Sequence, residues 1–244
     1  GFAARRLRFG RRLWFHLRIH SGGCVRLELK VFFPMWDELG ERERKELSSA
    51  AARRSAPAGA LIHGGGSDCT GLLLVESGRL RAYMLSGEGR EITIYRLFEG
   101  DICLLSASCA ISGLQIEVMV QAEADSEFLV IPAEVYRRAV ASSAPLANYM
   151  NEIMANRFSE VMWLMEQVMW KSMDRRLAAF LLEEAAIEGS DELKLTHERI
   201  AAHLGTAREV VTRLLRYFQS EGMVQLGRGS VDISDRKALA RLAE

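Results

Sequence analysis

The sequence predicts an α+β protein that combines an antiparallel β roll of the jelly-roll type, a long helix and a carboxy-terminal domain of short helices. Three observations predict this order. Short apolar runs separated by glycine-rich turns fill residues 60–131, apolar residues recur at helical spacing over residues 147–168, and shorter helical patterns follow. Closely spaced strands with such turns are typical of a β roll or sandwich.

We expect four parts along the chain: residues 1–33, 34–144, 145–170 and 171–244. The composition is that of a globular protein, because 49% of the 244 residues are apolar and 32 basic side chains balance 32 acidic ones. Every apolar run is shorter than the roughly 18 residues that a membrane span needs, so we expect no membrane partner. The four cysteines are unevenly spaced, which argues against a disulfide framework and favours a reducing cytoplasm.

Residues 1–33 carry eight basic residues and a single acidic one. We expect an extension without a fold of its own, unstructured or artefactual, and the alternative is a basic arm that contacts nucleic acid or lipid. His16, His20 and Cys24 would align on one helix face, but two glycines interrupt that helix and a fourth ligand is not evident. We therefore predict no metal site in this segment.

A short polar helix is expected over residues 36–53, and six strands are expected to follow it. The strands are the apolar runs at residues 72–75, 80–85, 92–97, 102–105, 116–120 and 128–131. Glycine-containing turns separate these runs, as at Gly78 and Gly100. The pattern predicts that the first folded unit is a β domain.

The long helix carries a regular seam whose positions alternate by four and three residues. The seam residues are Ala147, Asn151, Met154, Phe158, Val161, Met165 and Val168. A 4-3 repeat is the geometry of a coiled-coil contact, and a face this wide and rich in methionine suits an adaptable interface. We expect a homodimer through this helix, and the alternative is packing against the chain's own β roll.

Two short helices joined at a glycine follow in the last third of the chain. Thr196 is the candidate N-cap of the first helix, Gly205 suits a left-handed turn, and Thr206 is expected to cap the second helix over residues 207–220. Apolar positions of both helices face inward in this arrangement. The pattern is the sequence form of a helix-turn-helix.

The outward face of the second helix carries groups that make directional hydrogen bonds: Arg208, Glu209, Thr212, Arg213 and Arg216. Arginine can donate two hydrogen bonds to guanine, glutamate can accept one from cytosine, and threonine can contact a base or a phosphate. The hairpin expected over residues 222–233, with a basic tip at Arg228, is typical of a wing beside the phosphate backbone. We predict binding of double-stranded DNA, with Thr196 and Thr206 among the contacting residues.

The motif at residues 195–215, LTHERIAAHLGTAREVVTRLL, resembles that of the Crp/Fnr family of transcription regulators, and the resemblance extends over about residues 34–244. In that family an Arg-Glu-x-x-x-Arg pattern enters the major groove, and Arg208, Glu209 and Arg213 match it. The resemblance implies a homodimer that binds an inverted-repeat DNA site. It leaves RNA polymerase open as a further partner.

The β roll is similar to that family at Gly78, Gly100-Asp101 and Ala122, but it departs at the effector site. Members that bind cyclic nucleotide carry a glutamate for the ribose and an arginine for the phosphate, where this sequence has Leu105 and Ile116. We therefore expect that cyclic AMP is not the effector, and the cofactor stays unknown. The clustered amino-terminal cysteines of an iron–sulfur switch are also missing.

A candidate effector pocket surrounds the glycine-aspartate turn. Its members are Gly100, Asp101, Cys103, Ser106, Ser108 and Cys109. Together with Cys69, its thiols would be oxidised or would bind a soft ligand; the alternative is that they are small buried hydrophobes.

Two other classes of function compete with a DNA-binding regulator. One is an effector-binding module that acts through protein contacts with little DNA specificity, and the Arg208-Glu209 pair argues against it. The other is an enzyme of the cupin type, which needs several histidines at a metal, whereas His63 is the only histidine in the roll. We expect neither an enzyme nor a metal site.

Overall fold

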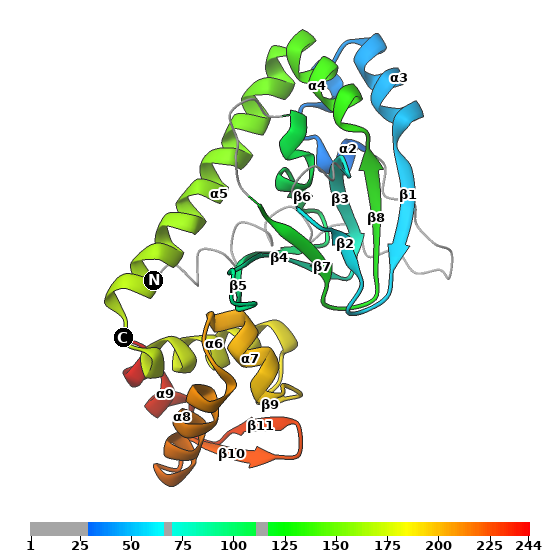
Figure 1. Cartoon of the computed structure of the whole chain (residues 1–244). Helices are drawn as coiled ribbons and strands as arrows, with labels where there is room; N and C mark the ends of the chain where they lie inside the picture. Colours follow the sequence, from blue (N-terminus) through cyan, green and yellow to red (C-terminus); the bar gives the residue numbers. More distant parts are fainter. Residues whose placement is uncertain (1–28, 66–69, 111–116) are drawn as a thin grey trace.

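The structure is a computed structural model, and it describes residues 29–65, 70–110 and 117–244 (Figure 1). It has the predicted α+β order: a β roll, a long helix that runs diagonally away from the roll, and a domain of short helices with a hairpin below it. None of the helices in these residues is long and apolar enough to cross a membrane.

In the described residues, eight strands build the roll as two four-stranded antiparallel sheets, ordered β1-β8-β3-β6 and β2-β7-β4-β5. Their bounds are Ala52–Ala56 (β1), Leu61–His63 (β2), Leu72–Ser77 (β3), Arg79–Leu85 (β4), Glu91–Phe98 (β5), Ile102–Cys103 (β6), Met119–Ala122 (β7) and Ser126–Ile131 (β8). The sequence did not predict β1 and β2. Strand β1 has four exposed residues out of five, so it lacks the apolar run that signals a strand.

Three of the expected elements differ from the structure. The strand expected over residues 116–120 is β7, which begins only at Met119 and ends at Ala122. The run at residues 102–105 is a strand only as far as Cys103, after which a 3-10 helix, η2 (Leu105–Ala110), begins. The helix expected over residues 36–53 is divided into η1 (Trp36–Glu38) and α3 (Glu41–Ala50). The chain then pairs with β8 as β1, because main-chain hydrogen bonds with that strand outweigh a weak local helix pattern.

Strand β3 lies at the centre of the fold because its two faces pack into different cores. Leu73 and Val75 face the other sheet, whereas Leu72 and Leu74 face a layer of helices. That layer contains α2 (Leu29–Phe32), α3, α4 (Ala133–Ser142) and the start of the long helix.

The amino-terminal boundary is a correction to the expected extension over residues 1–33. Phe32 and Phe33 are each only 1% exposed and pack in the helical layer, so the folded part already includes α2. The expectations for the basic arm and for His16, His20 and Cys24 concern residues outside the described ranges.

The long helix, α5, spans Ala144–Trp170. Its N-cap is Ser143, whose side chain accepts a hydrogen bond from the Leu146 N–H at 3.4 Å. Leu146 and Met150 are buried against the roll, but Phe158, Met165, Met169 and other large apolar residues of the second half are exposed. Only the beginning of α5 therefore belongs to the core of the roll.

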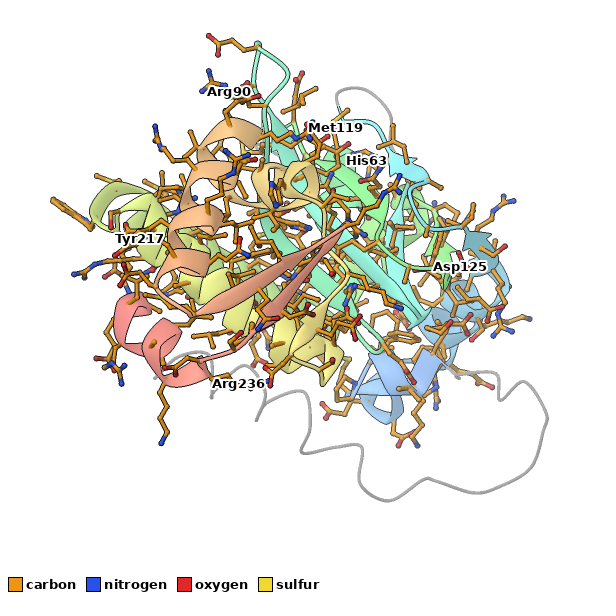
Figure 2. All side chains as sticks on the ribbon, turned by 90° about the horizontal axis from the view of Figure 1, so that it is seen from below. His63, Arg90, Met119, Asp125, Tyr217 and Arg236 are labelled. Atoms are coloured by element: carbon orange, nitrogen blue, oxygen red, sulfur yellow. The ribbon has the colours of Figure 1, made fainter. Side chains whose placement is uncertain are left out.

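The carboxy-terminal domain has a core of its own, built from Leu177, Ile200, Val211, Leu215 and the residues around them. Its elements are α6 (Met173–Glu188), β9 (Glu192–Leu193), α7 (His197–Leu204), α8 (Arg208–Ser220), β10 (Val224–Gly227), β11 (Ser230–Ile233) and α9 (Arg236–Ala243). In the view from below, this domain overlies the roll, with Tyr217 and Arg236 toward its periphery and Asp125 on a part of the roll away from it (Figure 2).

Candidate nucleic-acid interface and the domain junction

Helix α7 has the predicted start and end. Thr196 Oγ1 accepts a hydrogen bond from the Arg199 N–H at 3.2 Å, and Gly205 ends the helix with a φ of +70°. Gly205 also lies against the roll, since a Cβ placed there would be 3.2 Å from Ile92 Cβ. The turn of the helix-turn-helix thus touches strand β5.

The cap of α8 differs from the prediction. Ala207, rather than Thr206, is the N-cap, and no side-chain hydrogen bond closes this end of the helix. The Thr206 N–H instead donates to the Ala201 carbonyl at 3.1 Å, within the turn that follows α7. The expected capping role of Thr206 was therefore wrong.

Helix α8 separates an apolar face from a charged one. Val211, Leu215 and Phe218 are buried in the domain core. The predicted contact residues line a shallow depression of about 350 Å³ on the outer side: Arg208, Glu209, Thr212, Arg213 and Arg216. Within the described part of the chain, no ion pair involves any of these three arginines, so their positive charge is available to an external anion.

Thr212 already has a partner inside the domain, which the sequence did not predict. Its Oγ1 lies 2.8 Å from Nδ1 of His197, the first residue of α7. Burial, together with the positive charge of Arg208 and Arg216, lowers the pKa of His197, which therefore favours its neutral form. This contact ties the recognition face of α8 to α7.

The predicted wing is present. Strands β10 and β11 pair with Gly227 opposite Ser230, so Arg228 and Gly229 form the tip. Gly229 has a φ of +77°, and Arg228 is exposed. Strand β9 completes a three-stranded sheet that joins this hairpin to the domain core.

The arrangement matches two family models, the Crp-like helix-turn-helix domain over residues 175–242 and the cyclic nucleotide-binding domain over residues 53–143. A crystal structure from Eubacterium rectale, assigned to the crp/fnr family of transcriptional regulators, is 57% identical with a TM-score of 0.85, and the match covers 87% of this chain and 98% of that one. The chain belongs to the Crp/Fnr family.

Two curated relatives fit this assignment. The cyclic AMP receptor protein of Thermus thermophilus is 26% identical over 210 residues, which covers 86% of this chain and 96% of that protein. The fumarate and nitrate reduction regulatory protein of Escherichia coli K12 is 28% identical over 242 residues, which covers 93% and 94% of the two chains. Its relatives identify this Crp/Fnr protein as a transcription regulator with a DNA-binding helix-turn-helix.

The effector-pocket residues of this Crp/Fnr chain make internal contacts where they are described. Gly100 forms a turn with a φ of +87°, and Asp101 accepts a hydrogen bond from the Phe98 N–H at 2.9 Å. Cys103 and Ser106 are completely buried, and the Cys103 thiol lies 3.8 Å from the Tyr95 hydroxyl. These contacts favour the alternative in which Cys103 is a small buried hydrophobe.

The remaining residues of these sequence-based expectations lie outside the described side chains or ranges. The side chains of Ser108 and Cys109 are outside the described ones, and Cys69 and Ile116 lie in the gaps. Among the described residues, no group of three or more His, Cys, Asp or Glu side chains could hold a metal ion.

The two domains meet at a buried ion cluster that sequence reasoning missed. Glu123, which follows β7, lies 2.9 Å from Arg79 Nε and 3.0 Å from Arg96 Nε. Arg96 also donates to Glu184 of α6, while Arg79 reaches Glu188 at 2.9 Å. Strands of the roll are thereby joined to the first helix of the DNA-binding domain through charges that are mostly removed from water.

His203 of α7 completes this junction. Its Nε2 lies 3.2 Å from Glu123 Oε1 and 3.1 Å from Arg96 Nη2, and its Nδ1 lies 2.8 Å from Thr93 Oγ1. Burial and the neighbouring Arg96 lower the pKa of His203 to about 2. A charged residue at an apolar position was the available sequence signal, because Glu184 lies among Leu181 and Ala185 on the buried face of α6.

Proposed function

We propose that this chain is a dimeric, site-specific DNA-binding regulator whose α8 reads bases in the major groove. The observation that carries the proposal is the exposed face of α8, where three arginines project without a carboxylate partner in the described residues. An arginine can grip guanine with two hydrogen bonds, and Glu209 can accept one from cytosine. Arg228 of the wing and Thr196 at the start of α7 would contact phosphates.

His197 refines the role of Thr212 in this proposal. Because Thr212 Oγ1 is held by His197, the methyl group of Thr212 is the part that remains for the edge of a thymine. Direct readout then falls on Arg208, Glu209 and Arg213, while Arg216 lies one turn further along the helix from Thr212.

Selection of bound duplexes from a random DNA pool tests this function. We expect an inverted repeat with a G·C pair in each half-site and half-sites one helical turn apart, because a two-fold dimer places its recognition helices at that spacing. A single, non-repeated motif would contradict the dimer. Recovery of no common sequence would contradict base readout.

The proposed dimer forms through α5. Phe158 is 64% exposed and Met165 47% exposed, and both lie on the predicted seam with Val161 and Val168. Large apolar side chains at helical spacing are costly to leave in water, so a second copy of the same helix is the economical cover.

Replacing both Phe158 and Val161 by glutamate should give monomers, because two charges would enter the apolar seam of each helix. Asn156→Glu is the matched control, since Asn156 is exposed on the opposite side of α5. Sedimentation distinguishes the outcomes. A double variant that remains dimeric would place the interface elsewhere.

We also propose that the effector is not cyclic AMP. Leu105 stands where a ribose-binding glutamate is needed, and this leucine is buried in the core of the roll, where it can accept no hydrogen bond from a diol. Calorimetry with the full chain should show no micromolar binding of cyclic AMP. Binding at that level would overturn this interpretation.

A further inference from the structure

A cavity of about 180 Å³ lies where the β roll, the long helix and the DNA-binding domain meet. Its walls come from β5, α5, α6 and α7, and the cavity is partly open to solvent. The apolar and aromatic side chains of the wall are Ile94, Tyr95, Trp163, Leu164, Ala179, Phe180 and Leu204. Such a lining, with a few polar groups among it, is typical of small-molecule sites.

The cavity lies on a different side of α5 from the proposed dimer seam. Helix α5 contributes Glu160, Trp163, Leu164 and Gln167, which share one stripe at spacings of three and four residues. The seam residue Phe158 precedes Glu160 by two positions, which is about 200° around a helix with 3.6 residues per turn. A partner helix on the seam would therefore leave the cavity uncovered.

Arg176 gives the cavity a positive charge that its surroundings do not neutralise. Its Nη2 donates to the Leu204 carbonyl at 2.6 Å, and it takes part in no ion pair within residues 29–65, 70–110 and 117–244. Burial lowers its pKa. A half-buried guanidinium with several unused N–H donors favours an anionic ligand.

The wall also contains two acidic side chains, Glu160 and Glu183. Glu160 accepts from Arg157 at 2.8 Å, and Glu183 contributes to the negative charge around Arg96. They nevertheless limit the charge that the cavity tolerates. A phosphate dianion would meet two carboxylates and a single available guanidinium, whereas a carboxylate matches the planar fork of one arginine.

The volume limits the ligand to a single ring with a short substituent. A cavity of about 150 Å³ is sufficient for benzene, whereas drug-sized ligands need roughly 300–1,000 Å³. We propose that this cavity binds a small aromatic carboxylate, with Arg176 as the partner of the carboxylate and Trp163 and Phe180 beside the ring. Such a ligand would contact both domains and α5 at once.

The consequence for regulation rests on the proposed function, whereas the binding itself does not. A ligand that contacts β5, α6 and α7 favours the domain arrangement in which all three lie together. By linkage, the ligand changes the affinity of the protein for DNA by the same factor by which DNA changes the affinity of the protein for the ligand.

Calorimetry on the full chain tests the site with phenylacetate and with phenylacetamide, its neutral analogue of the same shape. We expect saturable binding of phenylacetate in the millimolar range or tighter, at one site per chain, and at least tenfold weaker binding of the amide, because only the carboxylate gains a charged hydrogen bond to Arg176. Equal affinities would overturn the role of Arg176. Absence of saturable phenylacetate binding at millimolar concentration would overturn the ligand class.

Three variants locate the binding. Arg176→Gln should weaken phenylacetate at least tenfold and leave phenylacetamide unchanged, whereas Arg175→Gln, at the exposed neighbouring position, should change neither. Ala179→Leu fills the cavity while it keeps Arg176, and should abolish binding of both probes. Circular dichroism checks that each variant folds. If phenylacetate binds equally to wild type, Arg176→Gln and Ala179→Leu, the site is not in this cavity.

Discussion

The arginines at the domain junction and those on α8 differ in the charge around them. Arg96 is 7% exposed in its side chain and contacts Glu123 and Glu184, and Arg79 contacts Glu123 and Glu188. On α8, by contrast, Arg208, Arg213 and Arg216 are exposed, and no described carboxylate pairs with them. Arginines thus join the two domains at the junction, whereas the arginines of α8 are unpaired within the described residues.

Burial and neighbouring carboxylates therefore indicate the role of an arginine, whereas the residue type alone does not. At the junction, the cost of removing charges from water is offset only if every partner stays in place. On α8, water solvates each guanidinium, so the charge remains ready for phosphate or base contacts at little cost to stability.

The largest difference between the two groups of arginines is expected for Arg96→Met. It leaves Glu123 and Glu184 buried without their common partner, and removing one member of a buried pair costs about 3–5 kcal/mol. Arg213→Met should change the free energy of unfolding by less than about 0.5 kcal/mol, as for an ordinary surface position. Urea unfolding measures both.

A second substitution tests whether unpaired carboxylates cause the loss of stability in Arg96→Met. Glu184→Gln in the Arg96→Met background removes one unpaired carboxylate, so part of the lost stability should return. If Arg96→Met and Arg213→Met have the same effect, the junction does not depend on this ion cluster.

On α8 the expected effect falls on DNA rather than on the fold. Arg213→Ala should cost about 1–3 kcal/mol in binding to the selected site and relax preference at one base pair per half-site. Binding to random duplexes should change much less. If both kinds of duplex weaken by the same factor, Arg213 contacts a phosphate, and the placement of α8 in the groove is wrong.

The stability of the junction should also depend on pH, because His203 is buried there. His203 has a pKa of about 2 in the fold, below its ordinary value of 6.5, so the unfolded chain binds a proton that the folded chain does not. Stability should therefore fall as the pH falls below 6.5, by about 1.4 kcal/mol per pH unit from this group alone.

His203→Gln should remove this part of the slope. The comparison with wild type is needed because the lowered pKa of His197 gives a slope of the same sign. Unfolding measured between pH 7 and pH 5 decides the matter, and identical slopes in the two proteins would show that His203 is not held neutral.

The smallest effect is expected at the wing. Arg228→Ala should leave the preferred sequence unchanged, weaken all duplexes alike and reduce the slope of log affinity against log salt by about 1, because one phosphate contact is lost. Titration of a labelled duplex over a range of salt concentrations measures this slope. An altered sequence preference would show instead that the wing reads bases.

The sequence predicted what depends on local patterns. The apolar spacing of α5, the cap at Thr196 and the turn at Gly205 each involve residues close in the chain, and each is present. It failed for β1, whose residues are held by pairing with β8 rather than by their own propensity.

The junction and part of the recognition face depend on long-range contacts that no local pattern contains. Arg96 and Glu184 are 88 residues apart, and Arg96 and His203 are 107 apart. His197 and Thr212 are closer, but their contact exists only because α7 and α8 pack at the angle that the domain core sets. A single sequence contains the residues of such clusters, but it does not indicate which distant residues come into contact.

The position of Gly205 couples the DNA-binding domain to the β roll, so the two domains cannot evolve independently at this contact. The residue must adopt a φ of +70° for the turn and must also lack a Cβ where Ile92 approaches. A side chain there would disturb the helix-turn-helix and the contact with the roll together. Evolution therefore cannot change the geometry of this turn in the DNA-binding domain without changing, in the same step, its contact with the β roll.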